Sequence, residues 1–226
     1  MSFVSVIIPC FNHARYLGEA LESVLSQSRP PDEIIVVDDG STDGSAAIAA
    51  RYPVRIFAQP NQGIGGARNK GLSVARGDVI GFLDADDVWT ENSLARRLDL
   101  LASAPALACV FGMVEHFISP ELDPSTAASL ECPQGASAAR FAGVMLARKS
   151  LFDAIGPFDA QVRVGEMMDL AARLAESGAS TANLDAVVMR RRIHGANTVL
   201  RERASHGDYL RVLKASLARK AAAQKP

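Results

Sequence analysis

Strand-like and helix-like segments alternate along the first part of this chain. Short apolar runs rich in valine and isoleucine recur, and segments whose apolar residues repeat every three to four positions lie between them. The predicted strands are residues 3–8, 33–37, 54–58 and 78–83, and the predicted helices are residues 14–28, 44–52 and 65–75. Alternation of this kind is typical of parallel sheets with helical crossovers. We therefore expect an α/β fold in which a mostly parallel central sheet is flanked by helices in a single domain.

The rest of the chain is less regular. Residues 119–138 are rich in serine, proline and alanine, which predicts a mobile loop or a short hairpin of the kind that serves as a lid or recognition segment. The other predicted helices are residues 93–102, 149–155, 169–177 and 209–223, and the other predicted strands are residues 108–117, 143–146 and 186–193. The last helix carries the cations Arg211, Lys214, Arg219, Lys220 and Lys225. They indicate either a solvated face or a weak anchor for anionic lipid, and we favour the solvated face because no aromatic belt accompanies them.

Composition limits the class of protein. The chain has 226 residues, 48% of them hydrophobic, and a formal net charge of -1. A chain of this length buries a substantial core, and near-neutral charge argues against a dedicated nucleic-acid binder. Cys10, Cys109 and Cys132 are odd in number and irregularly spaced, which fits neither a disulfide framework nor a zinc site. Since no segment resembles a signal peptide or a membrane span, we expect a protein of the reducing cytoplasm.

Polar clusters follow each of the first four predicted strands. They are residues 9–12, 38–41, 61–63 and 84–86. In open parallel sheets, ligands bind beyond the carboxyl ends of the strands. We therefore expect these four loops to meet at one edge of the sheet and to form one binding site there.

The loop after the fourth strand is acidic. An apolar run ends in Asp84, Asp86 and Asp87, and carboxylates this close together raise one another's pKa unless a cation compensates them. Hard divalent ions such as Mg²⁺ and Mn²⁺ prefer oxygen ligands and keep coordination positions for phosphate oxygens. The pattern predicts a metal-bound phosphorylated ligand. The alternative is a polar loop in which Asp87 caps the helix that follows.

The earlier loops carry residues of ligand-binding type. Asp39 could cap a helix or accept a hydrogen bond from an N–H donor such as the imide of uracil. Phe11 could pack in the core or stack on a base. The glycine-rich turn at residues 61–66 leads into a helix, whose N-terminus attracts phosphate. Arg68 follows this turn, where it suits either a diphosphate or an ordinary ion pair. The glycine spacing fits neither the dinucleotide fingerprint nor the P-loop, which argues against dehydrogenases and NTPases.

Residues late in the chain fit the same site. His194 follows an apolar strand and the run Arg190 to Arg192. It could be a further metal ligand, with the arginines compensating phosphate charge, or it could be a structural histidine. Glu166 and Asp169 lie three residues apart at a predicted helix start. They suit either carboxylates that stabilise the helix dipole or a general base for an acceptor hydroxyl.

Together these motifs resemble one family, the inverting family 2 glycosyltransferases with the Rossmann-like GT-A fold. The resemblance rests on the order and spacing of four segments, residues 4–12, 38–43, 61–71 and 83–87. In addition, residues 156–159 with 165–166 resemble the acceptor-side motif of the family, and residues 192–197 resemble its C-terminal histidine motif. It implies a nucleotide-sugar-binding half at residues 1–102, an acceptor-side half of the same domain at residues 103–200, and a basic C-terminal helix or tail at residues 201–226.

The resemblance also implies roles for single residues. The donor-binding set is Pro9, Phe11, Asn12, Asp39, Asn61, Gly63, Arg68, Asp84, Ala85, Asp86 and Arg192. Within this set, the loop 9–12 and Asp39 hold the nucleotide base, Arg68 approaches the diphosphate, and Asp84 lies nearer the ribose. The implied ligands of Mn²⁺ or Mg²⁺ are Asp86 and His194. The implied catalytic residues are Glu166 and Asp169.

The resemblance predicts a metal-dependent enzyme that moves a sugar from a nucleoside-diphosphate donor, UDP-linked, to an acceptor hydroxyl with inversion. The acceptor is a glycan, a lipid-linked sugar, a small molecule or a peptide, and nucleic acid is not a partner. Many relatives carry aspartate where this chain has Met167, so a non-catalytic protein that binds nucleotide sugars is the alternative. The expected location is the cytoplasm, with weak peripheral contact at the inner face of the membrane as an option.

Overall fold

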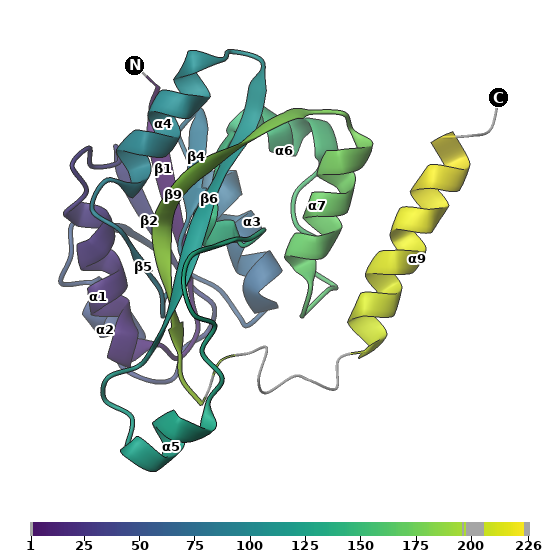
Figure 1. The fold of residues 1–226 in the computed structure, drawn as a ribbon. Helices are drawn as coiled ribbons and strands as arrows, with labels where there is room; N and C mark the ends of the chain where they lie inside the picture. The colour runs from purple at the N-terminus through teal and green to yellow at the C-terminus, as the bar shows by residue number, and fades with distance from the viewer. Residues whose placement is uncertain (1, 196, 198–205, 224–226) are drawn as a thin grey trace.

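One twisted sheet runs through the molecule, and helices pack on both of its faces (Figure 1). The computed structural model describes residues 2–195, 197 and 206–223. Within these residues the sheet has nine strands in the order β3-β2-β1-β4-β8-β6-β9-β5, and β7 pairs with β6 off this path. The prediction of a single α/β domain with a central sheet flanked by helices is confirmed.

The first half of the sheet is parallel. Every residue of β1 and β4 is buried, because helices cover both faces of the sheet, and this burial explains the unbroken apolar runs. The strands are β1 (Val4–Cys10), β2 (Glu33–Asp38), β3 (Arg55–Ala58) and β4 (Val79–Phe82), with β1 between β2 and β4 and with β3 outside β2. The connecting helices are α1 (Ala14–Leu25), α2 (Ser45–Ala49) and α3 (Gly63–Val74).

The second half of the sheet mixes strand directions. β8 (Met145–Arg148) is antiparallel to its neighbours β4 and β6 (Leu107–Ile118), whereas β9 (Ser180–Ile193) runs parallel to β6. The short strands β5 (Val88–Trp89) and β7 (Ser137–Ala138) pair antiparallel with β9 and β6, respectively. The helices are α4 (Ser93–Ser103), α5 (Pro124–Ser129), α6 (Lys149–Ile155), α7 (Glu166–Glu176) and α9 (His206–Ala223). In Figure 1, α1, α2 and α4 lie on one side of the sheet and α3, α6 and α7 on the other.

Residues 119–138 contain a helix that the sequence prediction missed. Asp123 caps α5 by accepting hydrogen bonds from the backbone N–H groups of Ser125 and Thr126 (3.1 and 3.0 Å), and Pro124 occupies its first position. The predicted strand at residues 143–146 also begins differently, with a turn of 3-10 helix at Ala142–Val144 before β8. Both elements are shorter than two helical turns, too short for sequence periodicity to give a signal.

The prediction that Asp87 caps the following helix is wrong. β5 intervenes, and α4 begins at Ser93 with Asn92 as its N-cap residue. The carboxylate of Asp87 is buried and accepts a hydrogen bond from the backbone N–H of Arg192 (2.9 Å). Asp87 therefore ties the acidic loop to the end of β9.

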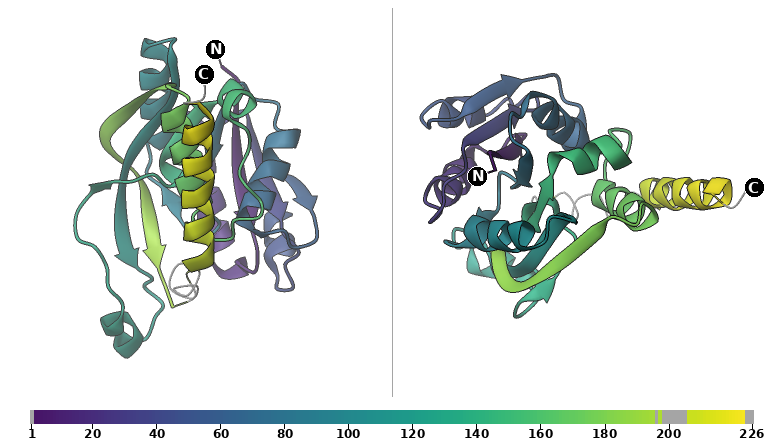
Figure 2. Two further views of the ribbon diagram at one scale, coloured as in Figure 1. Left: turned by 90° about the vertical axis from the view of Figure 1, so that its right-hand side faces the viewer. Right: turned by 90° about the horizontal axis from the view of Figure 1, so that it is seen from above.

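The C-terminal helix α9 lies outside α7 and is the outermost helix on that side of the molecule (Figure 2). Among the described residues, no helix is both long and apolar enough to cross a membrane. Lys225, Ala196 of the motif at 192–197, and residues 198–205 lie outside the described residues. The division into segments 1–102, 103–200 and 201–226 remains a prediction.

Helix α3 approaches the sheet closely at Gly71. A Cβ atom at this position would lie 2.3 Å from Cγ2 of Ile7, which is buried in β1. Interiors are packed densely enough that the extra carbon forces a shift of the helix or of the strand. Gly71 therefore fixes how closely α3 lies against the sheet.

We predict that Gly71→Ala lowers the free energy of unfolding by about 1–3 kcal/mol, because overpacking against Ile7 outweighs the better helix propensity of alanine. Gly44→Ala is the matched control, since its Cβ would meet only Ala14 Cβ at 3.8 Å. Urea unfolding of the two variants measures the difference. Equal stability of both variants would show that the α3–β1 contact is not close-packed.

Candidate active site

The loops after β1 and β2 are interlocked. Asn12 has a positive φ of 56° and its side-chain oxygen accepts hydrogen bonds from the backbone N–H groups of Thr42 (2.8 Å) and Asp43 (3.3 Å). The Asn12 N–H donates in turn to Ser41 Oγ (3.0 Å). Asparagine tolerates the left-handed conformation better than most residues. These hydrogen bonds fix the predicted base-binding loop to the turn that follows β2.

Asp39 connects this pair of loops to the loop after β3. It is buried, and its carboxylate accepts hydrogen bonds from the backbone N–H groups of Gln62 (2.9 Å) and Gly63 (2.8 Å) and from Nε2 of Gln59 (2.7 Å). Of the two roles open to Asp39, the helix cap is therefore present, although on α3 rather than on the helix that follows it in sequence. The neighbouring Asn61 is exposed.

Phe11 and Pro9 lie at the same edge in different surroundings. Phe11 is 44% exposed at the loop tip, so the structure does not place it in the core. Pro9 is buried within β1 and faces Val37 of β2 in the strand register. An exposed aromatic ring beside a polar loop is available for stacking on a flat ligand.

Arg68 lies at the centre of the site. Its Nη1 is 2.6 Å from Oε1 of Glu166 and its Nη2 is 2.7 Å from Oδ1 of Asp84, while the guanidinium lies over the ring of Phe158. The side chain is only 2% exposed. Burial alone would lower the pKa of Arg68, but the charges of the two carboxylates outweigh burial and raise it. Arg68 is therefore a fixed cation that joins α3, the acidic loop and the start of α7.

The acidic loop meets the end of β9. Nε2 of His194 lies 3.1 Å from Oδ2 of Asp86, and both side chains are largely buried. Burial would raise the pKa of Asp86, but the hydrogen bond with His194 and the nearby charge of His13 lower it overall. Asp87 shows the opposite behaviour, since burial and the charges of Asp86 and Asp84 hold its pKa well above the usual value. Ala85 between them is fully buried.

Arg192 holds the acidic loop from the other side. Its Nε donates to the carbonyl oxygen of Asp86 (3.0 Å), its Nη1 donates to Ser119 Oγ (3.3 Å), and its Nη2 pairs with Glu19 of α1. The guanidinium also lies 5.0 Å from the ring centre of Tyr16. Arg192 is buried and thus links the acidic loop to α1 and to the end of β6.

A divalent cation fits the donor atoms of Asp86 and His194. Among the described residues, no group of three or more His, Cys, Asp or Glu side chains could hold a metal by itself. Mg²⁺ in phosphate-processing sites is bound through only one or two carboxylates, with phosphates and water completing its shell. Burial and the charges of Asp86 and Asp84 together raise the pKa of Asp87, and a cation would relieve the repulsion among these carboxylates.

The two predicted catalytic carboxylates have different surroundings. Glu166 begins α7 and faces Arg68, whereas Asp169 forms ion pairs with Arg173 (2.8 Å) and with Arg219 of α9 (3.2 Å). Met167 is buried in the hydrophobic core. The structure therefore brings Glu166, but not Asp169, to the acidic loop.

The sequence analysis gave no role to three side chains around His194. The rings of Tyr16 and His13 have their centres 4.8 and 6.3 Å from that of His194, and Asn197 accepts the His194 backbone N–H (2.6 Å) with its side-chain oxygen. A signal for His13 was present, since it directly follows Asn12 in a loop that was already expected to bind ligand. Tyr16 gave no such signal, because it lies within the first turn of a helix.

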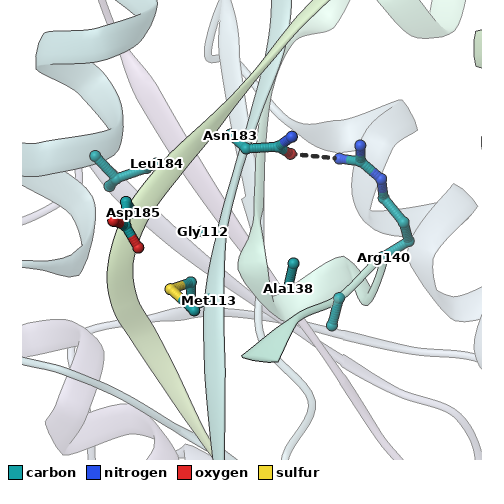
Figure 3. Close-up of a pocket in the computed structure, with 8 residues that line it drawn as sticks. Gly112, Met113, Ala138, Arg140, Asn183, Leu184 and Asp185 are labelled. Atoms are coloured by element: carbon teal, nitrogen blue, oxygen red, sulfur yellow. Dashed lines mark hydrogen bonds between the residues drawn. The ribbon is translucent and has the colours of Figure 1, made fainter. Parts of the chain in front are cut away.

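A separate cavity of about 310 Å³ lies between β6, β7 and the first part of β9 (Figure 3). Arg140 and Asn183 line it and are joined by a hydrogen bond (3.1 Å), with Met113 and Asp185 nearby. None of the predicted site residues lines this cavity. The candidate active site is therefore the interlocked edge of the sheet rather than this hollow.

Comparison with known proteins identifies the family. The family model described as Glycosyl transferase family 2 matches residues 5–160, which is more than half of the chain. The chain belongs to glycosyltransferase family 2. The matched span includes the loops at Asn12, Asp39 and Arg68 and the acidic loop, so the site described above lies largely inside the family region.

The individual relatives of this glycosyltransferase family 2 chain match about half of its residues. An uncharacterized glycosyltransferase of Nostoc sp. is 41% identical over 119 residues, covering 50% of this chain and 36% of the relative. A glycosyltransferase of Bacillus subtilis named for teichuronic acid biosynthesis is 39% identical over 119 residues, covering 50% of this chain and 46% of the relative. The matched part of the chain thus spans less than half the length of either relative.

Solved structures of TarS from S. aureus have the same fold. Residues 1–349 of TarS in complex with UDP-GlcNAc match with a TM-score of 0.68 at 20% identity, covering 86% of this chain and 59% of that fragment. The complex of the same fragment with UDP matches with a TM-score of 0.67, covering 85% of this chain and 61% of the fragment. At this level of identity the likeness establishes the fold of this glycosyltransferase family 2 chain and nothing finer.

We predict that Arg68→Met lowers the free energy of unfolding by about 2 kcal/mol, because it leaves Asp84 and Glu166 without their shared cation. The additional change Glu166→Gln restores about 1 kcal/mol by removing one of the two repelling charges. Urea unfolding of the single and double variants measures both values. Arg51→Met, at an exposed arginine on the surface, is the control. Additive effects of the two substitutions would contradict the pairing.

Proposed function

We propose that this chain transfers a sugar from a nucleoside-diphosphate sugar to an acceptor hydroxyl, with inversion at the anomeric carbon. The proposed donor is a UDP-sugar. The observation that carries the proposal is the ion-pair bridge from Asp84 through Arg68 to Glu166, which joins the acidic loop to a carboxylate on a helix start. Membership of the family and the likeness to TarS, which binds UDP and UDP-GlcNAc, support the same reading.

The nucleotide would lie over the interlocked loops. The exposed ring of Phe11 suits stacking on the base, and Pro9, Asn12 and Asp39 shape the loops around it. Asn61 and Gly63 bring the N-terminus of α3 to the same edge, where its positive dipole end favours phosphate. Asp84, which keeps one oxygen free of Arg68, suits the ribose hydroxyls.

The leaving diphosphate requires positive charge. Asp86 and His194 would hold Mn²⁺ or Mg²⁺, which when bound neutralises charge that develops on the diphosphate. Arg192 contributes by fixing the backbone of Asp86 through its carbonyl oxygen, and Ala85 by packing the loop into the core. Because the guanidinium of Arg68 is engaged with two carboxylates, we assign it to positioning Glu166 rather than to direct contact with phosphate.

Glu166 would act as the general base. It accepts the proton of the acceptor hydroxyl as the oxygen attacks the anomeric carbon, and the bond to the diphosphate breaks on the opposite face. A single displacement of this kind inverts the configuration. The hydrogen bond from Arg68 keeps the carboxylate of Glu166 directed at the acidic loop. Asp169 would act through its pairs with Arg173 and Arg219, which hold α7 in place.

One observation favours a second candidate, a non-catalytic protein that binds nucleotide sugars. Met167 is buried in the core, and the family resemblance places it where many relatives carry aspartate. In that case Glu166 would be a structural partner of Arg68. The acceptor in the catalytic proposal is a carbohydrate hydroxyl on a glycan, a lipid-linked sugar, a small molecule or a peptide, and the proposed compartment is the cytoplasm, where the three free cysteines stay reduced.

The proposal is tested by incubating the protein with a panel of nucleotide sugars, with and without Mn²⁺, and measuring released UDP. We expect release from a UDP-sugar that depends on Mn²⁺. Glu166→Gln should lower the rate by about 100-fold or more, since it removes the base without changing the shape of the side chain. Asp86→Asn should abolish stimulation by Mn²⁺.

Asp153→Asn is the matched control, because Asp153 is exposed on α6 and lies outside the site. It should behave as the wild type. Thermal stabilisation by UDP without any release from the panel would support the non-catalytic candidate. Full activity of Glu166→Gln would rule out its role as base, and full stimulation of Asp86→Asn by Mn²⁺ would overturn the metal assignment.

A further inference from the structure

The outer face of α9 carries a row of exposed leucines. Leu210, Leu213 and Leu217 are 55%, 55% and 58% exposed, and their spacing of three and four residues places them on one face of the helix. Large apolar side chains are rarely this exposed in a contiguous row on a soluble domain. We call these three residues the leucine stripe.

The opposite face of α9 is fixed to α7 by specific contacts. Arg219 pairs with Glu176 (2.6 Å) and Asp169 (3.2 Å), Ser216 Oγ donates to Glu176 (2.6 Å), and Val212 is buried. Asp208 accepts the backbone N–H groups of Arg163 and Val164 (3.0 and 3.1 Å), which anchors the first turn of the helix. The orientation of α9 is therefore set, and the leucine stripe faces away from the body.

The apolar surface continues from α9 onto the start of α7. Tyr209 and Met168 are both exposed, and both lie against Gly165, with Cε1 of Tyr209 3.3 Å and Sδ of Met168 3.6 Å from the position of a Cβ atom there. Met168 is two residues after Glu166. The surface thus extends from the leucine stripe to the helix end that carries the proposed base.

The charged side chains of α9 on either side of the leucine stripe are lysines, and Glu176 of α7, whose carboxylate Lys220 also approaches, is paired with Arg219. Lys214 and Lys220 are exposed, and a helix of 3.6 residues per turn places them on either side of the stripe. Among the described residues, neither lysine has a carboxylate within salt-bridge distance. Asp208, the one acidic side chain of α9, is engaged at the inner face.

We propose that α9 docks onto a lipid surface with anionic headgroups, with the leucine stripe in the interface and Lys214 and Lys220 against the headgroups. The cations of this helix alone favoured a solvated face, but the exposed leucines between them change that expectation. A helix that is apolar on one face and basic at its flanks binds in the plane of such a surface. A second copy of the chain is a less suitable partner for this face than an anionic lipid surface. If the leucine stripes of two copies packed together, the lysines beside them would face each other and repel. Figure 2 shows that α9 is the outermost element on its side, so none of the helices and strands that the structure describes lies between it and a flat surface.

Co-sedimentation of the full chain with lipid vesicles tests the proposal. We expect binding to vesicles of phosphatidylcholine and phosphatidylglycerol, weakened by salt, and much less binding to phosphatidylcholine alone. The variant Leu210→Gln/Leu213→Gln/Leu217→Gln should lose binding. Lys214→Gln/Lys220→Gln should weaken it by roughly 25-fold, or about fivefold for each lysine.

Two matched controls separate the stripe from general surface effects. Phe3→Gln/Ile56→Gln changes exposed apolar residues elsewhere, and Arg51→Gln/Arg96→Gln removes two exposed cations elsewhere. Both should bind vesicles as the wild type does. Unchanged thermal unfolding of the leucine variant shows that its side chains were not part of the core.

Three outcomes would overturn the proposal. They are failure of the wild type to sediment with anionic vesicles, wild-type binding by the leucine variant, and a dimer in light scattering that the leucine variant converts to a monomer. Vesicle binding is measured without donor, so it does not depend on the proposed function. Release of UDP from a soluble donor should be unchanged in the leucine variant, which keeps a failure of catalysis distinguishable from a failure of docking.

Discussion

The site depends on one buried cation. Arg68 holds Asp84 with one nitrogen and Glu166 with another, so that a helix from the first half of the chain, a loop after β4 and a helix from the second half meet at one point. Without it, two carboxylates would repel each other in a partly desolvated space. The position of Arg68 depends in turn on Gly71 one turn later, which lets α3 lie against Ile7 in the sheet. The geometry of the site therefore depends on the packing of α3 in the core.

Much of the fold could be predicted from the sequence. The buried parallel strands are continuous apolar runs and the helices between them have an amphipathic period, and both signals are local. Strand direction in the second half could not be predicted, because the antiparallel β8 and the parallel β9 have no pattern that distinguishes them. Asp87 shows the same limit. A carboxylate before a helix suggested a cap, but the short strand β5 separates it from that helix.

The location of the site could be predicted from the sequence, but the ion pairs between its side chains could not. Loops that follow parallel strands end at one edge of the sheet, so the expected topology placed Asn12, Asp39 and the acidic loop at the same edge. The partnership of Arg68 and Glu166 joins residues 98 positions apart and depends on tertiary structure alone. Glu166 and Asp169 were grouped by their spacing, yet α9 supplies Arg219 to the second of them and separates their roles.

The central claim is that Arg68 positions Glu166 and does not itself bind the donor. Steady-state kinetics of donor hydrolysis by Arg68→Lys test it most directly, because lysine keeps the charge but cannot hold both carboxylates in a fork. The account predicts that kcat falls by about tenfold or more while KM for the nucleotide sugar stays within about threefold of the wild type. A KM that rises by about tenfold with kcat unchanged would contradict it, since that result is expected of a residue that binds the diphosphate.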